Sequence, residues 1–153
     1  MGIKEKEIFN ELESIKKVFS NTIPCEIKTN INYDNQKTDF NLVYLIYCSF
    51  CKKSLVTNIH IYEYYNKYVF RLRAFITDES NYSFDLWNYL VYKNIIFDKN
   101  IFNFHIPQNE WYNTIHSYVS LITSFINKNE MQQILNTDYE PEIPIDWSRC
   151  GYK

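Results

Sequence analysis

Residues 54–76 read SLVTNIHIYEYYNKYVFRLRAFI, and this stretch decides the fold. Apolar and polar residues alternate on both sides of Asn66, which is typical of two strands joined by a tight turn. We expect a two-residue loop at Asn66 and Lys67, because Asn tolerates the left-handed backbone conformation. The expected pairs are Tyr65 with Tyr68, Glu63 with Phe70, Ile61 with Leu72, Ile59 with Ala74, Thr57 with Ile76, Tyr64 with Val69, Tyr62 with Arg71 and His60 with Arg73. One face of the hairpin then collects aliphatic side chains, and the other collects Tyr, His and Arg.

A helix and two further strands are expected before the hairpin. Residues 4–19 place apolar side chains at helical spacing, namely Ile8, Leu12, Ile15 and Phe19. Residues 25–33 alternate so that one face is polar, which indicates a strand near an edge of the sheet. Residues 40–48 are apolar on both faces, which indicates a central strand covered from both sides. Together with the hairpin these strands form a four-stranded antiparallel meander.

The second half of the chain predicts mainly helices. A helix after Ser83 buries Phe84, Trp87, Leu90 and Val91, and residues 101–106 form a short strand. The longest helix covers residues 108–127, and its apolar stripe consists of Trp111, Ile115, Val119, Ile122 and Ile126. A short helix over residues 130–135 follows.

From residue 137 the composition changes to TDYEPEIPIDWSRCGYK, in which Pro141 and Pro144 prevent a helix. The sequence therefore predicts a single α+β domain over residues 1–136. In it, the antiparallel four-stranded meander packs against the N-terminal helix and the C-terminal helices. Residues 137–153 are expected to form an extended acidic tail that packs on this domain or extends from it.

The composition excludes several function classes. Both glycines, Gly2 and Gly151, lie at the ends of the chain. Phosphate-binding loops, dinucleotide fingerprints and the G-x-S-x-G nucleophile turn all need internal glycines, so these motifs are excluded. The net charge of −2 makes nucleic acid an unexpected partner. No secretion signal or membrane-spanning apolar run is found, so we expect a cytoplasmic protein with no membrane partner.

The motif Cys48-Ser-Phe-Cys51 is the pattern that most resembles a site. A structural zinc site needs a second pair of Cys or His residues at similar spacing, and Cys25, Cys150 and the three histidines are scattered singly. We therefore expect buried or turn cysteines, with no metal and no cofactor. Whether Cys48 and Cys51 bind a metal stays open at this point.

No catalytic residue is predicted, and the protein is not expected to be an enzyme. Candidate acid–base residues occur without a recognisable spacing: His60, Glu63, His105, His116 and Glu110. Arg71 and Arg73, beside Tyr62 and Tyr64, allow three interpretations. They could form a stacking platform for single-stranded nucleic acid, lie under a helix, or contact a protein partner.

In size, acidic balance, Tyr and Trp content and lack of a catalytic motif, the chain resembles a small bacterial immunity protein of a contact-dependent or other polymorphic toxin system. Its many Asn, Ile, Lys and Tyr residues also resemble proteins from AT-rich bacterial or phage genes. The resemblance implies a protein that binds a cognate toxin, a nuclease among the candidates, and covers its active site. The alternatives are a phage-encoded inhibitor of a host enzyme, and a small nucleic-acid-binding protein or enzyme that uses the face of Tyr62, Arg71 and Arg73.

A nuclease attracts phosphate with an electropositive site, so the protein partner is expected to be basic. The surface expected to bind it combines aromatic anchors with carboxylates and the two arginines. Its residues are Tyr62, Tyr64, Arg71, Arg73, Asp78, Glu79, Asp138, Glu140, Glu142, Asp146 and Trp147.

Overall fold

The computed structural model describes residues 3–33, 40–50, 53–78, 83–96, 102, 105–127 and 130–135. The elements in chain order are α1 (Ile3–Thr22), β1 (Ile27–Tyr33), β2 (Asn41–Phe50), β3 (Lys53–Tyr64), β4 (Lys67–Asp78), β5 (Ser83–Asp85), α2 (Leu86–Tyr92), β6 (Ile106–Pro107), the 3-10 helix η1 (Gln108–Glu110), α3 (Trp111–Asn127) and α4 (Glu130–Leu135). None of the helices in these ranges has the length and apolar character needed to cross a membrane.

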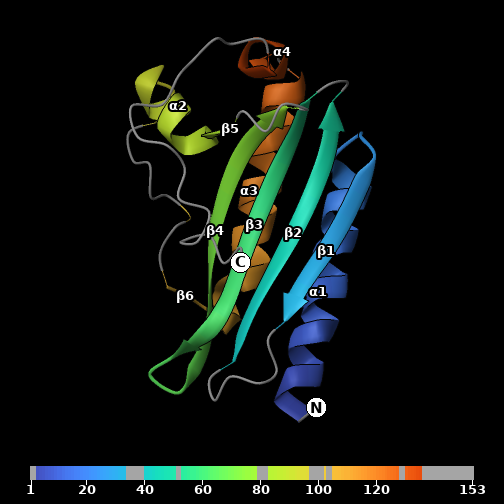
Figure 1. Ribbon diagram of the computed structural model, residues 1–153, viewed down its shortest axis with the longest axis vertical. Coiled ribbons are helices and arrows are strands. Elements are labelled where there is room, and N and C mark those ends of the chain that lie inside the picture. The colour runs from blue at the N-terminus through green and yellow to red at the C-terminus, as the bar shows by residue number, and fades with distance from the viewer. Residues whose placement is uncertain are drawn as a thin grey trace.

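The strands form one antiparallel sheet in the order β1-β2-β3-β4-β5, with β6 also paired to β4 (Figure 1). The predicted four-stranded meander is confirmed as β1 to β4, and β5 and β6 extend it. The predicted edge position of the first strand is also confirmed, because β1 lies at the end of this order. The fold is α+β, as the sequence predicted.

The predicted register of the β3–β4 hairpin is wrong by two residues. The loop residues are Tyr65 and Asn66, with φ angles of 51° and 61°. The observed pairs are Tyr64 with Lys67, Glu63 with Tyr68, Tyr62 with Val69, Ile61 with Phe70, His60 with Arg71, Ile59 with Leu72, Asn58 with Arg73, Thr57 with Ala74 and Leu55 with Ile76. A two-residue shift leaves every side chain on its predicted face, because side chains repeat with a period of two.

Turn chemistry explains this register. A two-residue hairpin loop of this hand needs positive φ at both positions, and Asn accepts it more easily than Lys does. The observed register gives the second loop position to Asn66 and moves Lys67 into the strand, where its backbone is extended. Tyr65 takes the first loop position, and its ring remains 82% exposed.

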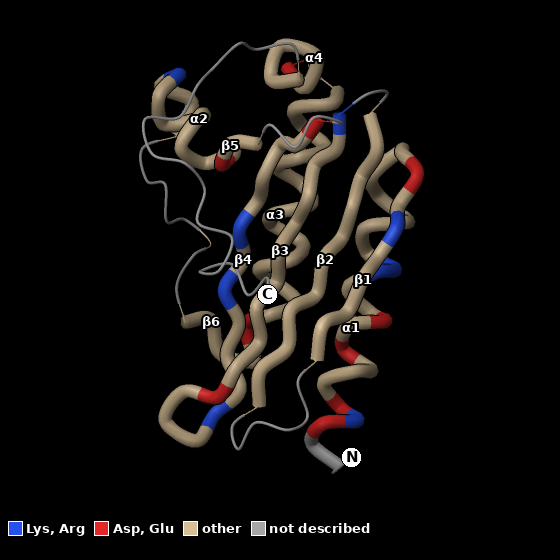
Figure 2. The backbone as a smooth tube through the Cα atoms, in the orientation of Figure 1, with Lys and Arg blue, Asp and Glu red and all other residues tan. Residues whose placement is uncertain are grey.

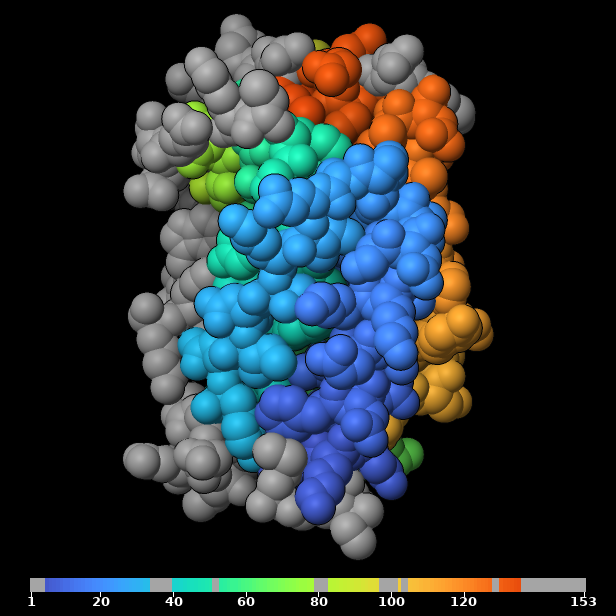
Figure 3. Space-filling model, turned by 90° about the vertical axis from the view of Figure 1, so that its right-hand side faces the viewer, coloured from blue at the N-terminus to red at the C-terminus, as the bar shows by residue number. Residues whose placement is uncertain are grey.

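The two long helices pack side by side on one face of the sheet, where they form the main core (Figure 1). Figure 3 shows the side of the molecule on which α1 lies beside the edge strand β1. The helices contribute Ile8, Leu12, Ile15 and Phe19 from α1 and Trp111, Ile115, Tyr118, Val119, Ile122 and Phe125 from α3. The strands contribute Leu42, Tyr44, Ile46, Leu55, Ile59, Ile61, Phe70, Leu72, Ala74 and Ile76. These residues confirm the predicted helical stripes and the aliphatic face of the hairpin.

The short elements after the hairpin differ from the prediction in their bounds. Phe84 lies in β5, and α2 begins at Leu86 because the carboxylate of Asp85 accepts a hydrogen bond from the Asn88 backbone N at 3.1 Å. Trp87 and Leu90 are buried as predicted, whereas Val91 is only partly buried. The strand predicted over residues 101–106 corresponds, among the described residues, only to β6, which begins at Ile106. The predicted helix over 108–127 starts with the 3-10 turn η1 and continues as α3.

The acidic tail predicted for residues 137–153 lies outside the described residues, as do Cys51, Glu79 and Cys150. Its placement on the domain stays a prediction.

Candidate functional site

The candidate site lies on the open face, by which we mean the side of β2, β3 and β4 that faces away from α1 and α3. The alternation of the hairpin places the predicted Tyr, His and Arg residues on this face: His60, Tyr62, Tyr64, Arg71 and Arg73. In the described ranges no helix lies over it (Figure 1). The interpretation in which a helix covers these residues therefore does not hold for the described part of the chain.

At the turn end of the open face, four side chains form an aromatic cluster, which consists of Tyr62, Tyr64, Arg71 and His105. The ring of His105 stacks on Tyr64, with 3.8 Å between ring centroids and 10° between planes. Its Nδ1 atom is hydrogen bonded to the hydroxyl of Tyr62. Tyr65 in the turn extends the cluster, because its ring lies edge-on to Tyr64 at 4.5 Å.

Arg71 fixes the protonation pattern of the cluster. Its Nη2 lies 3.5 Å from Nε2 of His105, and its guanidinium lies 5.4 Å from the centre of the Tyr62 ring. A guanidinium can only donate, so Nε2 of His105 accepts and the neutral imidazole carries its proton on Nδ1. His105 then donates to the Tyr62 oxygen, and the Tyr62 hydroxyl keeps its own proton for another acceptor.

The pKa shifts in the cluster agree with this pattern. Burial, followed by the nearby charge of Arg71, lowers the pKa of His105 from its ordinary value of 6.5. Burial raises the pKa of Tyr62, and Arg71 opposes that rise. Both groups are therefore uncharged at neutral pH, and Arg71 is the one charged member of the cluster.

This arrangement predicts a pH dependence. As the pH falls below 6.5, an unfolded His105 takes up a proton before the folded one does, so stability is lost between 6.5 and the lowered folded pKa. A pH titration followed by the NMR signals of the His105 ring should have its midpoint below 6.5. In the variant Arg71→Met the pKa of His105 should rise, but not fully to 6.5, because burial is the larger cause. An unchanged pKa in that variant would contradict the proposed contact between Arg71 and His105.

Arg73 lies on the same face but outside the aromatic cluster. Its Nη2 forms an ion pair with Oδ2 of Asp85 at 3.2 Å, and its guanidinium lies 5.0 Å from the centre of the Phe75 ring. Because Asp85 also caps α2, this ion pair ties β4 to the start of that helix. Arg71 and Arg73 therefore have different roles, although both belong to β4, along which Figure 2 shows the basic positions in blue.

The predicted acidic residues do not join the aromatic cluster in the described structure. Asp78 pairs with Lys53 at the opposite end of β4, seven residues from Arg71 and thus roughly 23 Å away along the strand. The other predicted site residues with acidic or aromatic character, Glu79, Asp138, Glu140, Glu142, Asp146 and Trp147, lie outside the described residues.

His105 and Tyr65 belong to the site although the sequence did not assign them to it. His105 lies in the segment predicted as a short strand, just before β6, and no local signal says which strand that segment joins. The pairing of Ile106 with Phe70 brings His105 to the hairpin. Trp111 holds this segment in place, because its Nε1 donates to the Ile106 carbonyl at 2.8 Å.

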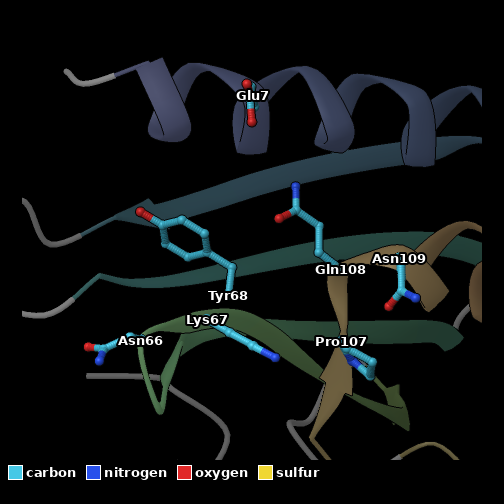
Figure 4. Close-up of a pocket in the computed structure, with 7 residues that line it drawn as sticks. All are labelled: Glu7, Asn66, Lys67, Tyr68, Pro107, Gln108 and Asn109. Carbon is cyan, nitrogen blue, oxygen red and sulfur yellow. The ribbon is translucent and has the colours of Figure 1, made fainter.

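A polar hollow of about 450 Å³ lies near the same end of the hairpin (Figure 4). It is lined by Glu7, Asn66, Lys67, Tyr68, Pro107, Gln108 and Asn109. These residues come from α1, from the hairpin and from the segment that leads into α3, so three distant parts of the chain meet here. The hollow offers charged and amide groups, whereas the aromatic cluster offers rings and a guanidinium.

The described cysteines contact each other. Cys48 is buried, and its thiol is hydrogen bonded to that of Cys25, which raises the pKa of Cys48 and lowers that of Cys25. Both are free thiols. Within the described ranges no group of three or more His, Cys, Asp or Glu side chains is placed to hold a metal ion.

Comparison of the chain with protein-family models, with curated proteins and with solved structures finds no match. The chemistry of the open face therefore has to indicate the function.

Proposed function

We propose that this protein binds and inhibits another protein, as an immunity protein does with its cognate toxin, and that the aromatic cluster with the β3–β4 turn is the contact surface. The observation that carries the proposal is a set of exposed, mutually packed aromatic rings beside an exposed arginine. Tyr64 is 40% exposed and Tyr65 is 82% exposed, although both are large rings. Tyr and Arg are enriched among the residues that dominate binding energy at protein interfaces.

The rings of the cluster are held in place before any partner arrives. Tyr64 is stacked on His105, and Tyr62 is hydrogen bonded to the same imidazole. Side chains that are already ordered lose little conformational entropy on binding, so more of their contact energy appears as affinity. Such a surface suits a stable inhibitor.

The polar hollow beside the turn supports a partner that contacts both the aromatic cluster and the hollow. The turn at Tyr65 and Asn66 joins the two long strands, and the polar hollow is lined by Asn66 itself. A partner that contacts Tyr64 and Tyr65 could therefore also reach Lys67 in the hollow. Rings that exclude water and a polar margin that gives specificity are the usual composition of such an interface.

The charge of the partner is a separate part of the proposal. A basic partner is supported by the carboxylates that the sequence carries between Asp138 and Asp146, which lie outside the described residues. The aromatic cluster itself presents the guanidinium of Arg71 and would not attract a basic surface. Its contribution is aromatic contact and hydrogen bonding, whichever charge the partner has.

A second candidate function is binding of single-stranded nucleic acid. The observation in its favour is the Tyr64–His105 stack beside Arg71, since bases stack on exposed rings and arginine neutralises phosphate. The ion pair of Arg73 with Asp85 weakens this candidate, because it neutralises the other arginine of the face.

The proposal predicts a loss of affinity on removal of the rings. The probe is a candidate toxin domain, sought at the C-terminus of secreted proteins encoded next to this gene, and binding is measured by calorimetry. The full-length chain should bind this domain and restore growth to cells that produce it. Tyr64→Ala should weaken binding by about tenfold or more, as loss of an interface anchor does. The control Tyr112→Ala, at a 60% exposed ring on α3, should leave the affinity unchanged.

Other results would separate the alternatives. If the full-length chain neither binds the domain nor restores growth, the proposed function is wrong. If it binds and Tyr64→Ala binds equally well, the function stands but the contact surface lies elsewhere. If the chain binds a single-stranded oligonucleotide and Tyr64→Ala abolishes that binding, the nucleic-acid candidate is preferred.

A further inference from the structure

The open face carries a second, apolar cluster at a distance from the turn. Its members are Val43, Leu45, Val56 and Phe75, and Tyr47 packs against them. Phe75 has no exposed surface and Val56 is 2% exposed. They belong to the side of the sheet away from α1 and α3, and within the described ranges no helix or strand lies over that side (Figure 1).

Neighbouring side chains do not account for this burial. On an uncovered sheet, an apolar side chain keeps its outer surface in water, because its neighbours stand beside it and not above it. The guanidinium of Arg73 lies over the ring of Phe75, but one such group cannot also cover Val43, Leu45 and Val56. A further layer must lie on this apolar cluster.

Charge limits what that layer can be. Arg71 and Arg73 lie on the same face directly beyond Phe75 along β4, and Arg71 is exposed. Arg73 already pairs with Asp85, so a suitable layer combines apolar side chains for the cluster with a carboxylate for Arg71.

One segment of the chain has this composition. In residues 136–153, apolar side chains alternate with carboxylates; the apolar ones are Tyr139, Ile143, Ile145 and Trp147, and the carboxylates are Asp138, Glu140, Glu142 and Asp146. No Lys or Arg interrupts the stretch from Asp138 to Trp147. Pro141 and Pro144 favour an extended backbone, which is the form that can lie flat on a sheet.

The point from which this segment leaves the domain is also suitable. The backbone carbonyl of Leu135, the last residue of α4, accepts a hydrogen bond from Nζ of Lys53, the first residue of β3. Val56 lies three residues further along β3, roughly 10 Å away, and His60, the pair of Arg71, lies roughly 23 Å away. An extended segment of the length of residues 136–153 spans roughly 60 Å, so it can reach all of them.

From these observations we infer that residues 136–153 lie extended across the open face, with their apolar side chains on Val43, Leu45, Val56 and Phe75. The alternating carboxylates then lie along the outer side of the segment, where the long side chain of Arg71 can reach one of them from beside it. The segment then covers the apolar cluster of its own chain and lies beside the aromatic cluster. This inference does not depend on the proposed function, because it concerns the isolated chain.

The test is NMR of the full-length chain with labelled methyl groups. We expect nuclear Overhauser contacts from the indole of Trp147 to the methyl groups of Leu45 and Val56. A soluble paramagnetic agent should relax the Val56 methyl groups as weakly as those of Ile59, which is buried on the other face. In the variant Ile145→Ser with Trp147→Ser, relaxation of Val56 should approach that of the 42% exposed Ile31, while Ile59 stays unchanged.

The control variant Tyr112→Ser removes an exposed aromatic ring elsewhere and should leave Val56 protected. The inference is overturned if the contacts from Trp147 are absent, or if Val56 stays protected in the double variant. Protection of Val56 that disappears on dilution would also overturn it, and would assign the open face to a second copy of the chain.

Discussion

Replacing Trp111 by alanine is expected to lower the free energy of unfolding by about 3–5 kcal/mol, the range for a large aromatic side chain removed from a core. Trp111 is 1% exposed and stacks on Phe70, with 5.1 Å between ring centroids and 11° between planes. Its loss leaves a cavity between α3 and β4 beside Phe70. It also leaves the Ile106 carbonyl without the hydrogen bond from Nε1.

Urea unfolding followed by far-ultraviolet circular dichroism measures this loss. Trp111→Phe keeps most of the ring stacking and loses the hydrogen bond, so it should cost about 1–3 kcal/mol. Tyr112→Ala, one residue further along α3, changes an exposed ring and should stay within about 0.5 kcal/mol of the wild type. Equal losses for Trp111→Ala and Tyr112→Ala would show that the helix presents a different face to the sheet.

Trp111 also connects the core to the aromatic cluster. Because Ile106 follows His105 directly, the hydrogen bond from Trp111 helps to hold the imidazole over Tyr64. The NMR signals of His105 should therefore shift in Trp111→Phe, although the substituted side chain is not in the cluster.

Local patterns predicted most of the fold. The helical spacing of Ile8, Leu12 and Ile15 belongs to residues close together in the chain, as does the alternation in β1 and β3. The spacing of apolar residues reflects which side of a helix or strand faces the core, and burial in the core supplies most of the stabilisation. They therefore predict the existence of elements well and their ends less well.

The hairpin register shows what periodicity cannot supply. A register shifted by two residues keeps every side chain on the same face, so the division into aliphatic and polar sides fits both registers equally well. The choice between them depends on the φ angles of Tyr65 and Asn66. Asn is more favourable than Lys at a loop position with positive φ. A prediction that kept Lys67 out of the loop would have found the observed register.

The aromatic cluster was predictable in part. Tyr62, Tyr64 and Arg71 come from adjacent strands, so alternation alone placed them together. His105 arrives from a segment that joins β4 through β6, and Arg73 is drawn to Asp85 because β5 pairs with the same strand. Both outcomes depend on which distant segments pair with β4, and no single-sequence pattern specifies that choice.

The hydrogen bond between Thr57 and Tyr118 is expected to couple β3 to α3. Thr57 Oγ1 lies 2.6 Å from the Tyr118 hydroxyl, and neither side chain has exposed surface. The ring of Tyr118 also contacts Phe19, with 5.9 Å between centroids, and Trp87 at 5.8 Å. Burial raises the pKa of the Tyr118 phenol far above its ordinary value, so the hydroxyl stays neutral and available for this bond.

A double-mutant cycle measures this coupling. Tyr118→Phe should cost about 1–3 kcal/mol of unfolding free energy, because the buried Thr57 hydroxyl loses its partner. Thr57→Val should cost a similar amount, since the Tyr118 hydroxyl is then buried without that bond. The double variant leaves neither hydroxyl behind, so its loss should be smaller than the sum of the two single losses by about 0.5–3 kcal/mol. If the losses add to within about 0.5 kcal/mol, the two hydroxyls do not interact, and packing of the Tyr118 ring alone joins α3 to this strand.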